Sequence, residues 1–167
     1  LELKNYNIFS QELADAVHAE GLEYTAALGV GGQWGVGLLS DKTMLKHDFI
    51  MTMSYGGVGN WNWKQKPDEA TCDKMLQDVN NLIARGLPKE KAIGGVPFYV
   101  TEFPLTEQTS YGQYNGVNCD IYTNPFYKKQ DPWHNDTLIS ETGNTVYINS
   151  INTLYKKMDV AIRDNSG

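Results

Sequence analysis

The segment 48–55 places the strongest constraint on the fold of this chain. It reads Asp-Phe-Ile-Met-Thr-Met-Ser-Tyr, which is almost continuously apolar and lacks the strict alternation of a strand with one face in water. Such a run is typical of a parallel strand buried on both faces. The short apolar segments 22–28 and 91–99 predict two more strands. We expect an α/β fold, because each return to a parallel strand needs a crossover, usually a helix.

Helical periodicity occurs between and around these strands. The segment 69–85 has the clearest stripe, and Gly86 and Pro88 follow it as stop signals. Segments 7–20 and 151–164 predict two further helices, and 41–46 predicts a short one capped by Asp41. Asn7 is the expected cap of the first helix. The predicted buried stripes are Phe9, Leu13, Ala16 and Val17 in the first helix, Cys72, Met75, Leu76, Val79, Leu82 and Ile83 in the central one, and Leu154, Met158, Ala161 and Ile162 in the last.

The region 100–145 lacks helical periodicity and is rich in Tyr, Asn, Thr and Pro. Within it, the sequence Asp131-Pro132-Trp133-His134 predicts a turn. Three strands cannot close a barrel, and a complete βα-barrel needs about 250 residues. We therefore expect the 167 residues to form an incomplete part of a larger domain. An unrelated parallel α/β protein is the alternative.

Composition excludes several classes of function. The net charge of −6, without a basic stripe, argues against nucleic acid as a partner. The longest apolar run is far shorter than the roughly 20 residues that cross a bilayer. The first residues show no secretory n-region or h-region, so we expect the numbering to begin inside a mature protein or a fragment. The cysteines and histidines show no metal-ligand or triad spacing, so we expect no metal and no cofactor. Cys72 is expected to be a buried free thiol, although a disulfide with Cys119 is an open alternative.

Aromatic residues are frequent and lie partly in loops. The chain has ten Tyr, four Trp and five Phe. Trp34 lies in the Gly-rich loop 29–37, and Trp61 and Trp63 lie in the Gly/Asn-rich loop 56–63 that follows the central strand. Rings on such loops suit the flat faces of sugars or stacked bases. Packing of the loops against the protein is an equally good explanation for each ring.

Three segments together resemble the family-18 glycoside hydrolases, the chitinases and their relatives. Residues 49–56 followed by Gly59-Asn60-Trp61 resemble the sixth barrel strand of that family. Residues 86–99 resemble the passage that leads into its seventh strand, and residues 146–149 with the following helix resemble the segment before its eighth strand. The three segments occur in the family's order and cover most of the chain.

The resemblance implies a partial (β/α)8 TIM barrel, about strands five to seven with their flanking helices. Residues 1–167 would be the C-terminal part of one barrel domain, with 100–147 as a variable insert after strand seven. The implied reaction is the retaining hydrolysis of β-1,4-linked N-acetylglucosamine, in which the acetamido oxygen of the substrate acts as nucleophile. The implied partner is chitin or another oligosaccharide that contains N-acetylglucosamine.

The resemblance also assigns roles to residues. Tyr55 matches the strand-six tyrosine that holds the acetamido carbonyl, although a buried, hydrogen-bonded Tyr is the alternative. Glu2 matches the end of the strand-four Asp-x-x-Asp-x-Asp-x-Glu motif and would be the general acid; the alternatives are an ordinary exposed Glu or a residue left from cloning. Trp61, Trp34 and Tyr99 are the expected substrate-binding residues, with packing beside the site the stronger expectation for Tyr99.

One position departs from the family pattern. The family's Asp after the strand-six Tyr is Gly56 here, which removes a carboxylate from the sugar cleft. A catalytically silent, lectin-like relative is therefore the alternative function. We expect this segment alone to be inactive and to require the missing barrel half or another copy of itself, because open sheet edges and apolar faces need partners. The resemblance implies an extracellular or cell-envelope location.

Overall fold

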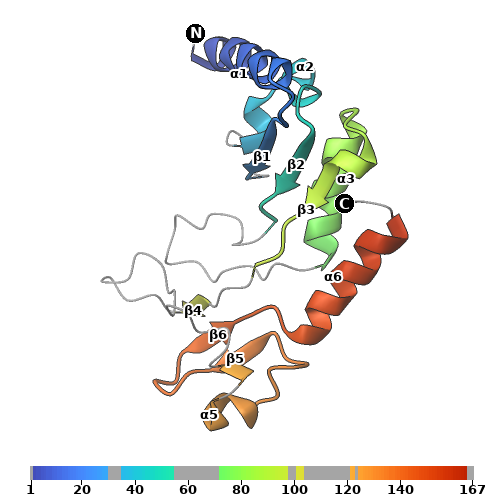
Figure 1. The fold of residues 1–167 in the computed structure, drawn as a ribbon. Coiled ribbons are helices and arrows are strands. Elements are labelled where there is room, and N and C mark those ends of the chain that lie inside the picture. The colour runs from blue at the N-terminus through green and yellow to red at the C-terminus, as the bar shows by residue number, and fades with distance from the viewer. Residues whose placement is uncertain are drawn as a thin grey trace. The chain divides into compact units, whose positions relative to one another are not determined.

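The computed structural model describes residues 2–29, 35–54, 72–97, 101–103, 121–122 and 124–164. Contacts divide the chain into two compact units, Leu1–Ser54 with Asp73–Gly95 and Val160–Gly167, and Tyr55–Cys72 with Val96–Asp159. The elements are α1 (Glu2–Ala19), β1 (Thr25–Leu28), η1 (Gly35–Leu38), α2 (Asp41–Met44), β2 (Phe49–Thr52), α3 (Cys72–Ala84), η2 (Lys89–Lys91), β3 (Ala92–Gly94), β4 (Thr101–Phe103), α5 (Pro125–Lys128), β5 (Thr137–Ile139), β6 (Thr145–Tyr147) and α6 (Ile151–Asp164), as Figure 1 shows.

The first unit contains the parallel sheet that the apolar segments predict. The strand order is β1-β2-β3, and both pairs are parallel. The strands are shorter than their apolar segments, since each covers only three or four residues. β2 is the central strand, and its side chains at Ile50 and Thr52 are fully buried. The expected side-by-side, parallel arrangement of the three apolar segments is therefore confirmed.

The helix α3 packs against this sheet through most of the predicted stripe. Cys72 is a free thiol, but it is half-buried rather than buried as expected. Met75, Val79 and Leu82 are buried, and Leu82 has no exposed surface. Asp78, beside this stripe, is also buried. One of its carboxylate oxygens pairs with Lys74, and the other has no hydrogen bond. The helix ends before Gly86, whose φ of 100° suits glycine. The buried core of this unit comprises Val36, Leu39, Met44, Ile50, Val79, Leu82, Leu87 and Ala92.

The helix α1 differs from its prediction in length and in its buried face. It begins at Glu2 rather than near Asn7, and it ends before Gly21 as expected. Its fully buried positions are Ser10 and Ala14, whereas the predicted core residues Phe9 and Leu13 are 60% and 38% exposed. The predicted buried stripe is therefore wrong for the described residues. The periodicity correctly identified a helix, but what covers an apolar face depends on tertiary structure.

Two predicted caps are also wrong. Asn7 lies inside α1, where its side-chain amide donates to the carbonyls of Leu3 and Leu38 and accepts from the backbone N–H of Ser40. The cap of α2 is Ser40 rather than Asp41, because the Ser40 hydroxyl accepts a hydrogen bond from the backbone N–H of Thr43. Both polar residues satisfy backbone groups, but at positions that depend on contacts between α1 and the segment before α2.

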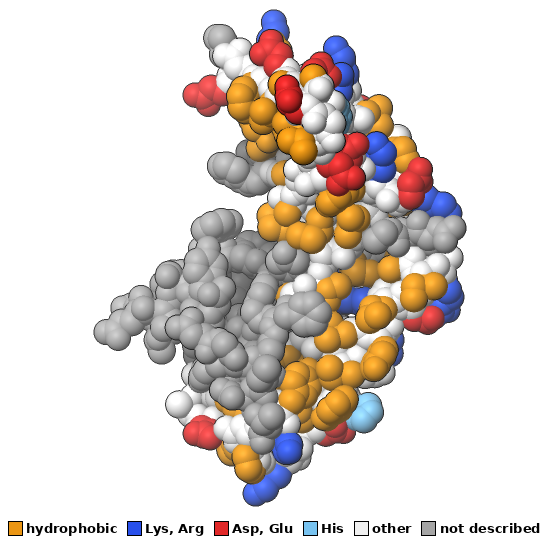
Figure 2. Space-filling view, in the orientation of Figure 1, with side chains coloured by type: hydrophobic (Ala, Val, Ile, Leu, Met, Phe, Trp, Pro, Cys, Tyr) orange, Lys and Arg blue, Asp and Glu red, His pale blue; other side chains and the backbone are white. Residues whose placement is uncertain are grey.

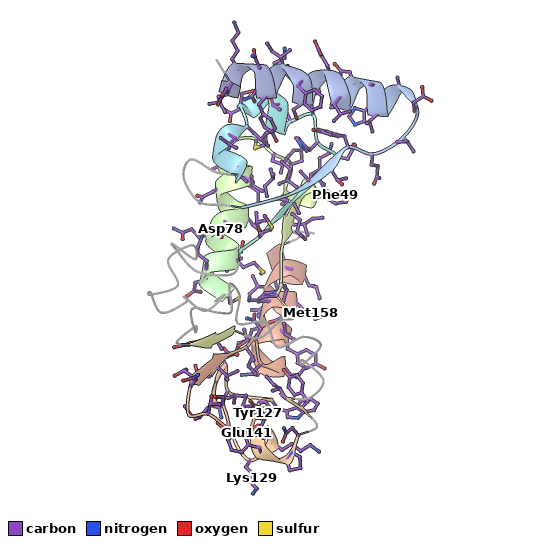
Figure 3. All side chains as sticks on the ribbon, turned by 90° about the vertical axis from the view of Figure 1, so that its left-hand side faces the viewer. Phe49, Asp78, Tyr127, Lys129, Glu141 and Met158 are labelled. Carbon is purple, nitrogen blue, oxygen red and sulfur yellow. The ribbon has the colours of Figure 1, made fainter. Side chains whose placement is uncertain are left out.

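The second unit holds an antiparallel sheet within the region expected to be an insert. The strand order is β4-β6-β5, with both pairs antiparallel, and the short helix α5 precedes β5. The expected lack of a long helix holds for the described part of 100–145. The buried core of this unit consists of Ile121, Tyr127, Leu138, Val146 and Ile148, of which Tyr127 lies in α5 (Figure 3).

The helix α6 has the predicted bounds but not the predicted buried stripe. Met158 and Ile162 are 57% and 73% exposed, and Figure 3 labels Met158. The fully buried side chain is Lys157, which is 1% exposed and donates a hydrogen bond to Asn149 Oδ1 at 2.6 Å. Burial lowers the pKa of Lys157 to about 8, against the weaker effects of nearby Cys72 and Asp136. The first turn of α6 is capped by the Ser150 hydroxyl.

We predict that Lys157 makes stability depend on pH. Its pKa is about 8 in the folded protein and 10.5 when unperturbed, so the unfolded state binds more protons between these values. The free energy of unfolding should therefore rise by up to about 3 kcal/mol from pH 8 to pH 10.5. The Lys157→Met variant should lack this rise. Urea unfolding at several pH values measures it, and equal slopes in both proteins would contradict the prediction.

Candidate functional site

The three parallel strands end together at one edge of their sheet. Leu28, Thr52 and Gly94 are paired in register at the ends of β1, β2 and β3. The hydrogen bonds continue one residue further, since the Met53 N–H donates to the Leu28 carbonyl at 2.8 Å and the Gly95 N–H donates to the Thr52 carbonyl at 2.9 Å. The segments that follow all three strands therefore leave from a common edge. In α/β folds, ligands bind at this carboxyl edge.

Two buried hydroxyls fix the end of the central strand. The Ser54 hydroxyl donates to Thr52 Oγ1 at 2.8 Å, and Thr52 Oγ1 donates to the Ile93 carbonyl at 3.3 Å. Both side chains are almost fully buried. This chain of hydrogen bonds joins the end of β2 to β3 through side chains as well as backbone. Because the hydroxyls are not accessible, they hold the strand end in position and do not contact a ligand.

The end of β3 approaches α3 closely. A side chain at Gly94 would place its Cβ 2.8 Å from Cγ and Sδ of Met75. A larger residue at this position would therefore force the Met75 side chain to shift. Met75 is nearly fully buried, so the end of β3 and α3 pack closely here.

The Gly-rich loop after β1 leaves and rejoins the described chain at the same place. The Val36 N–H donates to the Gly29 carbonyl at 2.9 Å, and a Cβ at Gly35 would lie 2.0 Å from the Gly29 oxygen. Gly35 also has a φ of 68°, which glycine adopts without strain. Gly29 and Gly35 are thus held close together at the end of β1, and Trp34 belongs to the undescribed residues between them in the sequence.

Arg85 holds the segment that follows this loop. Its guanidinium donates to the Val36 carbonyl at 3.0 Å and to the Leu39 carbonyl at 2.5 Å, and its Nε donates to the Asp41 carboxylate at 2.8 Å. One side chain at the end of α3 therefore satisfies two backbone carbonyls of η1 and the residue after it, and pairs with the first residue of α2. The planar fork of Arg is suited to this simultaneous bonding. The sequence contained no signal for this role beyond a lone Arg before Gly86.

Four of the five expected site residues lie outside the described residues. They are Tyr55, Trp61, Trp34 and Tyr99. Tyr55 directly follows Ser54, the last described residue after β2, and Tyr99 follows the described Val96 and Pro97 by two residues. Their roles stay predictions.

Glu2 is exposed and is the first residue of α1. The middle and the C-terminal end of α1 contact segments that directly precede strands: Ser10 bonds to the Tyr24 hydroxyl, and His18 Nε2 donates to Asp48 at 2.8 Å. Figure 1 accordingly shows α1 at the end of the sheet where β1 and β2 begin. The hydrogen bond from the Tyr24 N–H lowers the pKa of Asp48, with a further contribution from His18. Because the other expected site residues lie outside the described part of the chain, the role of Glu2 as acid stays a prediction.

The described histidines occupy separate environments. His18 pairs with Asp48, and His134 pairs with Asp131. His47 is buried, which lowers its pKa, and it hydrogen-bonds through Nδ1 to the carbonyls of Thr43 and Met44. Among the residues that the structure describes, no group of three or more His, Cys, Asp or Glu side chains is arranged to hold a metal ion. None of the helices in that part of the chain combines the length and apolar character of a membrane span.

The fold is similar to that of solved chitinases and spore enzymes. The GH18 chitinase ChiB of Flavobacterium johnsoniae matches with a TM-score of 0.70 and 22% identity over 93% of this chain. The spore cortex-lytic enzyme SleL of Bacillus megaterium matches with a TM-score of 0.71 and 14% identity over 99%. The cell-surface-expressed chitinase ChiW of Paenibacillus matches with a TM-score of 0.69 and 16% identity over 98%.

The expected resemblance to family-18 glycoside hydrolases is thus confirmed in the fold. This chain spans 45% of the ChiB chain, 41% of the SleL chain and 22% of the ChiW chain. No family model matches the sequence, and no curated protein matches it. The structural likeness therefore rests on the arrangement of helices and strands.

We predict that the three bonds of Arg85 stabilise the first unit. Arg85→Ala should lower the free energy of unfolding by about 2–4 kcal/mol, because it leaves partly buried carbonyls without donors. Arg85→Lys should recover little of this loss, since an ammonium group lacks the fork geometry. Urea unfolding measures both variants. Lys4→Ala, at an exposed position of α1, is the control and should change stability by less than about 0.5 kcal/mol.

Proposed function

We propose that this chain forms part of the barrel of a family-18 glycoside hydrolase. The enzyme would act on chitin-type chains, hydrolysing β-1,4-linked N-acetylglucosamine with retention. The observation that carries the proposal is the common carboxyl edge of β1, β2 and β3 in a chain that has the fold of such enzymes. Tyr55, which matches the family's strand-six tyrosine, directly follows the segment that extends β2 beyond this edge.

The proposed chemistry uses the substrate's own acetamido group. Its carbonyl oxygen attacks the anomeric carbon while a carboxylic acid protonates the leaving oxygen, and water then opens the cyclic intermediate with retention. In this proposal, the Tyr55 hydroxyl donates a hydrogen bond that holds the acetamido group in line, and the acid is the Glu that closes the strand-four motif. Glu2 matches that Glu by sequence, although the described α1 lies where β1 and β2 begin and not at their carboxyl edge. Trp61, Trp34 and Tyr99 contact the sugar rings. The Thr52 and Ser54 hydroxyls and the Gly94–Met75 contact hold the strand ends that carry these segments.

The described surfaces support the proposal that further βα units complete the domain. Within the described part of the first unit, β1 and β3 each pair with β2 alone. Leu3, Tyr6 and Phe9 are exposed on α1, and Figure 2 shows hydrophobic side chains at the surface of this helix among charged ones. Open strand edges and apolar helix faces are commonly covered by other elements. A TIM barrel supplies both strands and helices for this purpose.

The alternative proposal is a lectin-like protein that binds the same sugars without cleaving them. Gly56 favours it, because a side chain with a carboxylate is missing after Tyr55. The strand-four sequence of the full-length protein discriminates between the two, since the acid must close an intact Asp-x-x-Asp-x-Asp-x-Glu motif. For either function, an extracellular or cell-envelope location fits a polymeric substrate.

We predict that residues 1–167 alone do not hydrolyse a chitobiose reporter substrate. The reason is that a partial barrel assembles neither the complete cleft nor the strand-four carboxylates. A fluorogenic assay of the isolated chain, beside the full-length protein at equal molar concentration, measures this. Sustained turnover by the isolated chain would show that it is a sufficient catalytic unit and would overturn the prediction.

We also predict that Tyr55→Phe in the full-length protein lowers kcat by about 10²-fold. Removing one donor that acts on the developing charge typically has an effect of this size. KM should change much less, because the ring remains. The matched control is Tyr155→Phe, which removes a hydroxyl from an exposed position of α6 and should leave kcat unchanged. Equal rates for Tyr55→Phe and wild type would remove the tyrosine from the mechanism.

A further inference from the structure

The turn at residues 131–135 presents an exposed tryptophan in the second unit. Trp133 is 53% exposed, whereas the preceding Pro132 is almost fully buried. Asp131 adopts a φ of 53°, which is uncommon for a residue other than glycine. The turn expected from the sequence at this place is therefore confirmed, and its backbone conformation turns a large aromatic ring toward solvent.

The turn is held by several hydrogen bonds. The Asn135 N–H donates to the Asp131 carbonyl at 3.0 Å, and the Asn135 side chain donates to the Gln130 carbonyl at 2.8 Å. His134 Nδ1 donates to the Asp131 carboxylate at 3.0 Å. The Trp133 carbonyl accepts a hydrogen bond of 2.9 Å from the Asn152 N–H at the start of α6. The backbone that carries the indole is thus fixed on both sides.

The indole itself is also supported. The Tyr122 ring lies against it in an edge-to-face arrangement, with 5.8 Å between the centroids and 67° between the planes. Tyr122 is half-buried, and its hydroxyl donates to the Asn149 carbonyl. A ring that is already held loses little conformational freedom when a ligand stacks on it. This gives an exposed aromatic surface that is organised before binding.

The polar groups of the turn indicate the class of ligand. Asp131 and His134, on either side of Trp133 in the sequence, are both largely exposed and so offer hydrogen-bonding groups next to an apolar ring. A pyranose presents an apolar C–H face surrounded by hydroxyls, which matches this combination. The carboxylate and the net charge of −6 argue against a nucleic acid, whose stacked bases are accompanied by phosphates.

We infer that Trp133, Asp131 and His134 form a saccharide-binding platform on the second unit. The pyranose face stacks on the indole, and its hydroxyls donate to the Asp131 carboxylate. The choice of an N-acetylglucosamine oligomer as the ligand rests on the proposed function. The platform consists of residues that the proposed hydrolysis does not use, so it adds a binding contact without taking part in bond cleavage.

The test compares variants of the full-length protein in binding to chitotetraose and in hydrolysis of the short reporter. Trp133→Ala should weaken calorimetric affinity for chitotetraose by about tenfold, the loss of one stacked ring, and leave reporter hydrolysis unchanged. Trp133→Tyr should recover part of the affinity. Tyr155→Ala, which removes another exposed aromatic ring, should change neither.

The outcomes separate this inference from the proposed function. Binding that depends on Trp133 in a protein that never hydrolyses the reporter would support the platform and contradict the glycosidase. Unchanged affinity in Trp133→Ala would overturn the platform whether or not hydrolysis occurs, and so would the absence of chitotetraose binding in the wild type. If Trp133→Ala fails to fold, the wild-type indole N–H resonance of Trp133 decides by NMR: a shift on titration supports the platform, and no shift contradicts it.

Discussion

The parallel register of β1, β2 and β3 is the constraint on which the first unit depends. Pairing of Leu28, Thr52 and Gly94 brings three chain segments, far apart in sequence, to one edge of the sheet. With β2 antiparallel to its neighbours, the residue after Ser54 would leave from the opposite edge. The common edge at which the described strands end is therefore a consequence of strand direction, and strand direction follows from the helical crossovers.

The elements that could be predicted are those whose packing surfaces follow from the local pattern of apolar residues and glycines. The run Phe49-Ile50-Met51 correctly predicts a parallel strand, which the structure places at the centre of the sheet. Burial on both faces is only partly confirmed, because Ile50 is buried whereas Phe49 and Met51 are half-buried. The stripe of Met75, Val79 and Leu82 needs one apolar surface, which the sheet provides. Gly86 and Gly21 follow their helices in conformations that favour glycine. Each of these signals is local and unambiguous.

The rest depended on contacts that no local pattern contains. Phe9 and Met158 lie on apolar stripes yet are exposed. Burial was predicted wrongly for them because periodicity identifies an apolar face of a helix but not the element that covers it. Lys157 is buried and donates a hydrogen bond from Nζ to Asn149 Oδ1, whereas the helix pattern predicts an exposed position for a lysine here. The carbonyl partners of Arg85 lie 46 and 49 residues away in the chain. The expected site residues came from motifs, and their positions depend on segments that follow the described strand ends.

Buried and partly buried polar groups hold the places where three described segments begin. The Thr52 and Ser54 hydroxyls hold the end of β2, Arg85 holds the chain after the loop of Trp34, and Asp136 accepts bonds from the Ser150 N–H and the Thr153 hydroxyl at the start of α6. A buried polar group without a partner is costly, so each of these contacts favours one backbone position over its alternatives. Apolar packing alone tolerates small shifts of a strand end or turn. Directed hydrogen bonds do not, so these polar contacts define where each of the described segments begins.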